Sequence, residues 1–239
     1  MQYLSHERLI SLNITTPEIL NALEKLLRDQ AAGKAHAAPK TMIVPGDGRY
    51  MMATLSTSDE PPFMATKTVL LNQENSAKGG DAINASITLT HSQSGETLAV
   101  MDGNWITGVR TAAASVLAAR YLAKKDAAVV AFIGCGVQAH SHLNMLADLY
   151  PLTTVHALGK GAKNRDVLCD AARAMGFEAV ASENAQQAVE GADIVVSSIP
   201  LTSQAAPFID ASWLKPGAFI ASTDSCLPWM NESLGIFDR

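Results

Sequence analysis

The alternation of apolar and polar positions changes character near the middle of the chain. Between residues 40 and 101 the apolar positions fall in short runs rich in β-branched residues, with no long helical period between them. The runs cover residues 41–44, 50–55, 66–71, 85–90 and 97–101, and turn-forming clusters at 45–48, 78–81 and 93–95 separate them. Short runs at this spacing predict a mostly antiparallel sheet.

A helix is predicted before this sheet. Thr16, Pro17 and Glu18 are typical of an N-cap, a first-turn proline and an acidic first turn, and we expect the helix to continue to about residue 32. Its apolar face consists of Leu20, Leu23, Leu26 and Leu27. Because these leucines recur at helical spacing, we expect the helix to pack on the sheet through that face.

The second half of the chain has a different rhythm. An alanine- and leucine-rich stretch over 110–123 predicts a connecting helix. Predicted strands at 129–133, 154–158, 193–198 and 218–222, with a short one around Val180, then alternate with predicted helices at 137–150 and 165–175. This alternation is typical of a doubly wound parallel sheet. We therefore predict an α/β protein in which a Rossmann domain, residues 121–239, follows an α+β domain, residues 1–120, with the boundary near 110–126.

The strand predicted at 129–133 runs directly into a glycine-rich turn. Gly134, Gly136 and Ala139 match the G-x-G-x-x-G/A pattern of dinucleotide-binding folds, and Val137 opens the predicted helix. The glycines permit a tight turn and a close backbone approach, and the small Ala139 permits close packing of helix on strand. The free N–H groups of such a helix can hold a pyrophosphate. The turn therefore predicts a dinucleotide site.

Composition narrows the classes of protein that remain. The 239 residues carry a net charge of −5, which argues against nucleic acid as a main partner. No apolar stretch approaches the roughly 18 residues of a membrane helix, and the N-terminus does not resemble a signal peptide. Cys135, Cys169 and Cys226 match neither a disulfide framework nor a metal site, so we expect no metal and a cytoplasmic location.

Two cationic residues are candidates for substrate chemistry. Lys67 lies within an apolar run, where a buried ammonium could polarise a carbonyl or an imine, although an edge-strand lysine that discourages aggregation has the same pattern. Arg110 begins the predicted connecting helix and could grip a carboxylate in bidentate fashion. The alternative for Arg110 is a surface position or a pair with Asp102.

Asp224 is a third candidate. It ends a predicted parallel strand, and ligands bind outside the carboxyl ends of such strands, so an acid or base is plausible there. From the residues alone, an aspartate that caps the next turn is the competing interpretation, and the pattern favours it.

Several motifs, in this order, resemble the ornithine cyclodeaminase/μ-crystallin family, which includes alanine dehydrogenases and ketimine or imino-acid reductases. They are residues 98–104, Ile106-Thr107, Arg110-Thr111-Ala112-Ala113, residues 134–139, residues 191–195 and Leu214-Lys215-Pro216-Gly217. The resemblance extends over nearly the whole chain. It implies that the first domain binds substrate and forms a homodimer, and that the second binds a nicotinamide dinucleotide.

The resemblance also implies roles for individual residues. Lys67 falls on the family's active-site lysine, Arg110 on its carboxylate-binding arginine and Asp224 on an aspartate that transfers protons in catalytic members. Asn75 matches an asparagine that follows the lysine strand and is assigned to substrate binding. The residues expected at the cofactor are Thr111, Gly134, Gly136, Val137, Gln138, Ala139, Lys160, Ser197, Ser198 and Ile199.

This sequence departs from the family pattern at two basic positions. Lys40 stands where many members have a second carboxylate-binding arginine, so carboxylate binding there would be looser and the ornithine substrate is in doubt. No acid follows the strand 154–158, and Lys160 could meet a 2′-phosphate instead, which favours NADP over NAD. A solvated Lys160 in an enzyme that accepts either cofactor is the alternative. Family members also continue beyond the position of Arg239, so the C-terminal part of the family fold is expected to be missing.

These observations favour an NAD(P)H-dependent oxidoreductase that acts on a small α-imino or α-amino acid. One alternative is a redox-neutral cyclodeaminase that releases ammonia with the same residues. A second alternative, from a different class, is a non-catalytic NADPH-binding protein like the crystallin branch.

Overall fold

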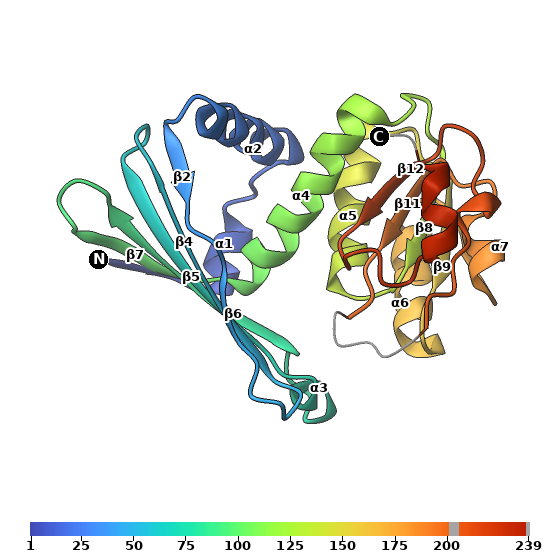
Figure 1. The fold of residues 1–239 in the computed structure, drawn as a ribbon, viewed down its shortest axis with the longest axis horizontal. Coiled ribbons are helices and arrows are strands. Elements are labelled where there is room, and N and C mark those ends of the chain that lie inside the picture. Colours follow the sequence, from blue (N-terminus) through green and yellow to red (C-terminus); the bar gives the residue numbers. More distant parts are fainter. Residues whose placement is uncertain (201–205, 238–239) are drawn as a thin grey trace. The chain divides into compact units, whose positions relative to one another are not determined.

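The computed structural model describes residues 1–200 and 206–237. The chain forms two compact units, Met1–Arg110 (unit 1) and Thr111–Arg239 (unit 2) (Figure 1). The division falls within helix α4 (Asn104–Leu122), which covers the stretch where the sequence predicts a connecting helix.

Unit 1 contains the antiparallel sheet that the short apolar runs predict. Its strands are β1 (Gln2–Leu4), β2 (Ala35–Ala37), β3 (Thr41–Ile43), β4 (Tyr50–Ser58), β5 (Phe63–Leu71), β6 (Ile83–His91) and β7 (Thr97–Asp102). They are arranged in the order β1-β7-β6-β5-β4-β2, and β3 also pairs with β4. Only the β1–β7 pair is parallel among these described strands. The sequence pattern did not predict β1 and β2, because three-residue strands are too short to show a period.

Three helices belong to unit 1 in addition to the start of α4. They are α1 (His6–Ser11), α2 (Thr16–Ala31) and α3 (Glu74–Ala77). The N-cap of α2 is Thr15, not Thr16 as predicted, and Thr15 forms a reciprocal capping box with Glu18. The expected apolar face is only partly buried. Leu20 is 1% exposed, whereas Leu26 and Leu27 are 46% and 51% exposed.

Helix α4 begins six residues before the predicted start, so Arg110 lies in its second turn rather than at its first residue. The sequence between Asn104 and Arg110 contains Ile106, Thr107, Gly108 and Val109, which have low intrinsic helix propensity. A local pattern therefore did not predict this turn. A hydrogen bond from the N–H of Ala85 in strand β6 to the side chain of Asn104 stabilises it instead.

Unit 2 contains the doubly wound parallel sheet. Its strands are β8 (Val129–Ile133), β9 (Thr154–Leu158), β10 (Glu178–Ala181), β11 (Ile194–Ser197) and β12 (Phe219–Ser222), in the order β10-β9-β8-β11-β12. Each of the described pairs is parallel. The chain builds outward from β8 to one side and then returns to add β11 on the other. The strand order therefore reverses between β8 and β11, which is the topological switch point of a Rossmann-type sheet.

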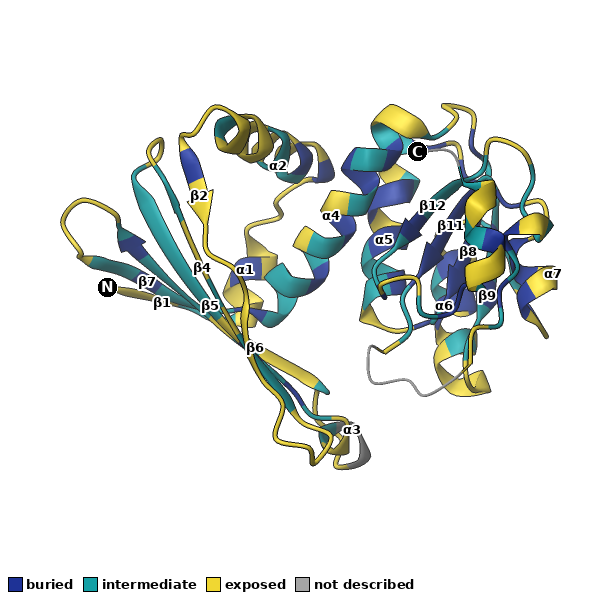
Figure 2. Ribbon diagram, in the orientation of Figure 1, coloured by how far each residue is buried: buried dark blue, intermediate teal, exposed yellow. Residues whose placement is uncertain are grey.

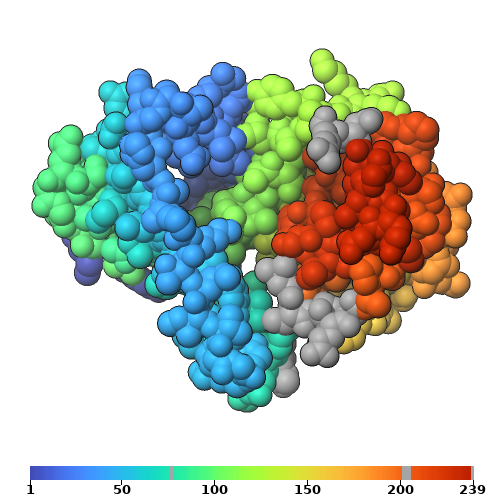
Figure 3. All heavy atoms as spheres, viewed as in Figure 1, coloured from blue at the N-terminus to red at the C-terminus, as the bar shows by residue number. Residues whose placement is uncertain are grey.

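The connections of unit 2 are mostly helical. They are α5 (Val137–Leu149), α6 (Ala162–Ala174), α7 (Ala185–Val189) and two short 3₁₀ helices, η1 (Ala211–Trp213) and η2 (Asn231–Ile236). Helix α5 has the predicted bounds within a residue, α6 begins three residues earlier than predicted, and α7 was not predicted. The last described residues, coloured red, lie at the surface of unit 2 (Figure 3).

The core of unit 2 lies along its central strands, which are dark blue in Figure 2. The described residues 130–133 of β8 are at most 1% exposed, as expected for a strand covered on both faces. At the beginning of this strand, Asp193 accepts hydrogen bonds from the backbone N–H groups of Ala128 and Val129. Lys215 pairs with the same carboxylate at 2.6 Å. This clip holds the beginning of β8 against the beginning of β11.

Within the described ranges, no helix is both long enough and apolar enough to cross a membrane. The same residues contain no group of three or more His, Cys, Asp or Glu side chains arranged to hold a metal ion.

Candidate functional sites

The candidate substrate site of unit 1 centres on Lys67 in strand β5. Lys67 pairs in register with Thr54 of β4 and Ile87 of β6, so it lies in the middle of the sheet rather than at an edge. Its ammonium donates a hydrogen bond of 3.4 Å to the hydroxyl oxygen of Thr107 on α4. The interpretation of Lys67 as an edge-strand lysine is therefore wrong, because strands flank β5 on both sides.

The charges of two other predicted residues, Arg110 and Lys40, affect Lys67. Burial lowers the pKa of Lys67 to about 8, and the positive charges of Arg110 and Lys40 contribute to this shift. Burial also lowers the pKa of Arg110, while Tyr50 acts in the opposite direction. Two cations, one on α4 and one in the segment before β3, therefore lie close enough to Lys67 on β5 to act on it. Such a concentration of positive charge favours binding of a small carboxylate.

Thr107 and Tyr50 were not among the predicted site residues. Thr107 follows Ile106 in one of the family motifs, and its spacing of three from Arg110 places both on one side of a helix, a signal that could have identified it. Asn75 lies in α3, where its carbonyl oxygen accepts hydrogen bonds from the N–H groups of Lys78 and Gly80. In the described part of the chain no hydrogen bond joins the Asn75 side chain to the three cations.

The candidate nucleotide site of unit 2 lies at the switch point. Gly134 follows β8 with a φ of +94°, a conformation that favours glycine. A Cβ atom on Gly134 would lie 2.6 Å from the carbonyl oxygen of Ser198, which follows β11. The two loops that leave the central strands therefore touch, and only glycine permits this approach.

The next residues leave space and polar groups for a ligand. Gly136 is the N-cap residue of α5 without a side-chain cap, and a Cβ on it would meet no atom within 4 Å. Gln138, in the first turn, has a buried Oε1 without a hydrogen-bond partner among the described residues. Ala139 is fully buried against the sheet, whereas Val137 is 70% exposed. Open space, uncapped N–H groups and an unpaired amide oxygen fit a dinucleotide, whose pyrophosphate needs donors and whose ribose offers hydroxyls.

Two further features border this loop. Cys135 is buried, and burial, together with Cys169, raises the pKa of its thiol to about 12, so the loop carries no thiolate at neutral pH. Lys160 is exposed in the short turn between β9 and α6, the position where Rossmann domains meet the ribose of the nucleotide.

Asp224 lies directly after β12 and is fully buried. Its Oδ1 accepts hydrogen bonds from the hydroxyls of Ser197 at 3.0 Å and Ser222 at 2.6 Å, and its Oδ2 accepts one from the N–H of Ile199 at 3.1 Å. Trp229 donates its indole N–H to the Ser197 hydroxyl. The structure therefore joins three predicted residues, Asp224, Ser197 and Ile199, in one buried network. Thr111, also predicted at the cofactor, lies on α4 and is partly buried.

The fold and these sites are typical of a two-domain dinucleotide-binding protein. A mixed sheet with three cationic residues precedes a Rossmann-type domain, and the glycine loop at its switch point leaves space beside Gly136. Residues 3–229 match the ornithine cyclodeaminase/mu-crystallin family, and the chain belongs to that family.

Individual relatives agree with this assignment. An alanine dehydrogenase from Archaeoglobus fulgidus is 33% identical over 234 residues, covering 96% of this chain and 68% of that protein. The structure of Thermococcus litoralis Δ1-pyrroline-2-carboxylate reductase in complex with NADH and L-proline has a TM-score of 0.86 and 30% identity, covering 93% of this chain and 68% of that one. An archaeal alanine dehydrogenase dimer with bound NAD has a TM-score of 0.83 and 30% identity, covering 92% and 66%. The chain thus spans about two thirds of the length of these relatives.

Proposed function

We propose that the protein is an NAD(P)H-dependent oxidoreductase that acts on a small α-imino or α-amino acid. The observation that carries this proposal is the cluster of Lys67, Arg110 and Lys40 in a chain that also has an open dinucleotide loop. The relatives that reduce or oxidise C–N bonds support the same reaction class.

The residues of unit 1 would bind and polarise the substrate. Arg110 and Lys40 would hold the carboxylate, the first as a planar fork and the second as a point charge. Lys67 would donate a hydrogen bond to the imino or keto group, with Thr107 orienting its ammonium. Because the pKa of Lys67 is about 8, this group can also release a proton near neutral pH.

Asp224 is proposed for proton transfer, as the family resemblance implies. Its carboxylate is fully buried, so it would exchange protons through the hydroxyl of Ser222, a partly exposed residue whose oxygen lies 2.6 Å away. Asp224 would also hold the backbone of Ile199 in place beside the dinucleotide loop.

The residues of unit 2 would hold the cofactor. The N–H groups at the start of α5 would bind the pyrophosphate, and Gln138 would accept a hydrogen bond from a ribose hydroxyl. A bound reduced nicotinamide supplies the hydride that reduces the C=N bond. The exposed Lys160, with no acid after β9, supports a preference for NADP over NAD.

We also propose a homodimer through unit 1. Met42, Ile43 and Val44 at the β3 edge are 58%, 62% and 67% exposed. An open groove of about 510 Å³ lies beside them and is lined by residues of β3, β4, β5 and β6, including Met51 and Leu70. Ile43 also lines this groove, and an exposed apolar strand edge beside an apolar groove is typical of a subunit interface.

A spectrophotometric panel tests the function. The purified protein is incubated with cyclic imino acids, or with keto acids plus amines, and the absorbance of NADPH and of NADH is followed separately. We expect stoichiometric loss of the reduced cofactor, with a higher kcat/KM for NADPH than for NADH.

The other outcomes identify the alternatives. Ammonia release from a diamino acid without net change in cofactor absorbance would indicate a cyclodeaminase. Tight NADPH binding without turnover on any member of the panel would indicate a non-catalytic binding protein and would contradict the proposal.

A further inference from the structure

We propose that Asn104 is a positioning residue that, together with Asp81, sets the first turns of α4 so that Thr107 and Arg110 face Lys67. Neither Asn104 nor Asp81 belongs to the candidate substrate or cofactor residues described above. The inference rests on the proposed function for its kinetic meaning, but its geometry stands without it.

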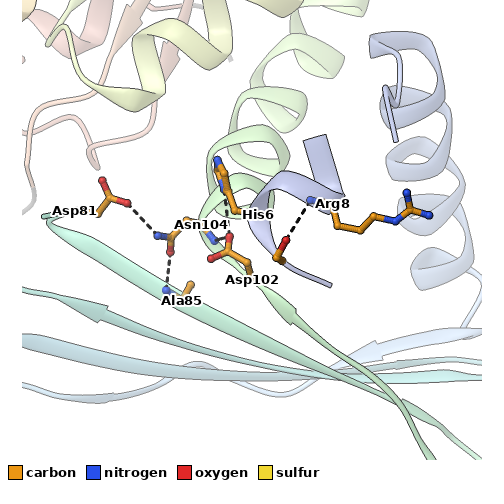
Figure 4. A network of polar contacts seen from close by, with 7 residues as sticks. His6, Arg8, Asp81, Ala85, Asp102 and Asn104 are labelled. Atoms are coloured by element: carbon orange, nitrogen blue, oxygen red, sulfur yellow. Dashed lines mark hydrogen bonds and ion pairs between the residues drawn. The ribbon is translucent and has the colours of Figure 1, made fainter. Parts of the chain in front are cut away.

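Asn104 is the first residue of α4 and makes three hydrogen bonds to other residues of unit 1 (Figure 4). Its Oδ1 accepts from the N–H of Ala85 on β6 at 2.7 Å, and its Nδ2 donates to the carboxylate of Asp81 at 3.3 Å. Its own N–H donates to Oδ1 of Asp102 at 2.9 Å. One amide side chain thus extends the β6–β7 ladder beyond the end of β7 and ties the helix start to the loop before β6.

The neighbouring Gly103 also fixes the position of this turn against strand β6. Its N–H donates to the carbonyl of Ala85 at 2.8 Å, and a Cβ on Gly103 would lie 2.7 Å from the Cβ of Ala85. The backbone of Gly103 and the side chain of Asn104 therefore both bond to Ala85 of β6. The helix start has little freedom to slide or rotate without breaking one of these bonds.

Asn104 lies one to two helical turns before Thr107 and Arg110, the residues of α4 that interact with Lys67. Thr107 is one turn beyond Asn104, and its N–H donates to the carbonyl of Gly103. Arg110 follows three residues later, so Thr107 and Arg110 project from neighbouring positions of one side. Since Lys67 donates to Thr107 and is affected by Arg110, a rotation of the helix start would disturb both relations.

The chemistry of the site explains why an amide suits this position. Asn104 lies between the carboxylates of Asp81 and Asp102, and Asp102 also faces His6 of α1 at 3.4 Å (Figure 4). An amide accepts from Ala85 and donates to Asp81 at the same time. A carboxylate at this position would keep the first bond but repel Asp81.

The test compares Asn104→Ala with a matched control, Asn184→Ala. Asn184 is also an asparagine at a helix start, where it accepts from the N–H of Gln187, but it lies in unit 2. Two quantities are measured: kcat/KM on the best substrate of the panel, and the titration midpoint of Lys67 by NMR of protein labelled at the lysine Cε.

We expect Asn104→Ala to lower kcat/KM about 10- to 100-fold, as misplacement of binding groups by about 1 Å does. We also expect its Lys67 midpoint to rise from about 8, because solvent enters and Arg110 moves away. The control should change neither.

A charge-balanced exchange provides the rescue. Asn104→Asp alone should behave like Asn104→Ala, because its carboxylate faces Asp81. The double variant Asn104→Asp with Asp81→Asn restores a donor opposite an acceptor at the same net charge, and we expect it to regain most of the lost kcat/KM. If Asn104→Ala does not fold, Asp81→Ala, which removes only the weaker bond, is measured in its place and should shift the midpoint in the same direction.

The two readouts separate this inference from the proposed function. An unchanged Lys67 midpoint and unchanged kinetics in Asn104→Ala would overturn the inference, as would failure of the exchange to restore either. A shifted midpoint in a protein without turnover on any panel member would support the inference while the proposed function fails.

Discussion

The surroundings of Lys67 disfavour its charged form. Burial and two neighbouring cations lower its pKa to about 8, whereas an unfolded lysine titrates near 10.4. Between these values the unfolded state binds more protons than the folded state, so stability rises with pH across that window. Below pH 8 Lys67 is protonated in both states, and the cost of its half-buried charge is constant.

Lys67→Met is therefore expected to be more stable and inactive. Removal of the half-buried ammonium should raise the free energy of unfolding at pH 7 by about 1 kcal/mol, a common gain when a functional group is replaced by a better-packed apolar one. It should also abolish the rise in stability between pH 8 and 10.4. Urea unfolding at several pH values measures both effects. A variant that loses stability, or keeps full turnover, would contradict this role.

At the scale of elements, the glycine loop combines a structural glycine with one that faces open space. Gly134 has a positive φ and contacts Ser198, whereas Gly136 has a φ of −92° and no neighbour within 4 Å of its Cβ position. Folding should therefore require the first glycine, and ligand binding the second.

The pair of variants Gly134→Ala and Gly136→Ala separates these roles. We expect Gly134→Ala to lose about 2 kcal/mol or more, because of backbone strain and overlap. Gly136→Ala should stay within about 0.5 kcal/mol of the parent, as a surface substitution does, but bind NADPH at least tenfold more weakly. Thermal unfolding and fluorescence titration with NADPH provide the measurements. Equal NADPH affinity in Gly136→Ala and the parent would exclude this loop as the pyrophosphate site.

The clip at Asp193 is expected to control the acid stability of unit 2. Burial opposes its ionisation, but hydrogen bonds from Lys215, Ala128 and Val129 outweigh that effect and lower the pKa of Asp193. A lowered pKa contributes stability above the unfolded value of about 3.9 and loses it as the pH falls toward the folded value.

Asp193→Ala should destabilise the protein by about 1–3 kcal/mol at pH 7, because two backbone N–H groups and one ammonium lose their acceptor. The difference from the parent should shrink as the pH falls below about 4. Asp170→Asn serves as the control, since Asp170 pairs with Arg173 at the surface with 76% of its side chain exposed. That control should change stability by less than about 0.5 kcal/mol. Equal losses in both variants would show that the clip contributes nothing specific.

At the scale of the whole molecule, the exposed apolar edge at β3 supports association through unit 1. Native mass spectrometry should show a dimer at micromolar concentration. Ile43→Asp, which places a charge on a strand edge that is 62% exposed, should shift the population to monomers without a large change in monomer stability. A monomeric parent protein under the same conditions would contradict the proposed homodimer.

Prediction from sequence succeeded where local periodicity reports burial. The bounds of β8, α5 and β9 agree with the predicted ranges within a residue. Strand β8 is covered on both faces and is therefore continuously apolar, which makes its ends visible in the sequence. Prediction failed at the start of α4, where residues of low helix propensity follow Gly103 and Asn104, which both bond to Ala85 of a distant strand. Leu26 and Leu27 also show a helical period, yet they are exposed.

The sequence by itself determined the two-part α/β organisation, the glycine turn and the family, because these depend on local pattern and short-range spacing. Only the tertiary structure decided that Lys67 lies in mid-sheet opposite Thr107 and that Asp224 is buried between Ser197 and Ser222. Strand register and helix position bring together residues separated by tens of positions along the chain. No local pattern records those contacts, since they arise only when the sheet and the helices have packed.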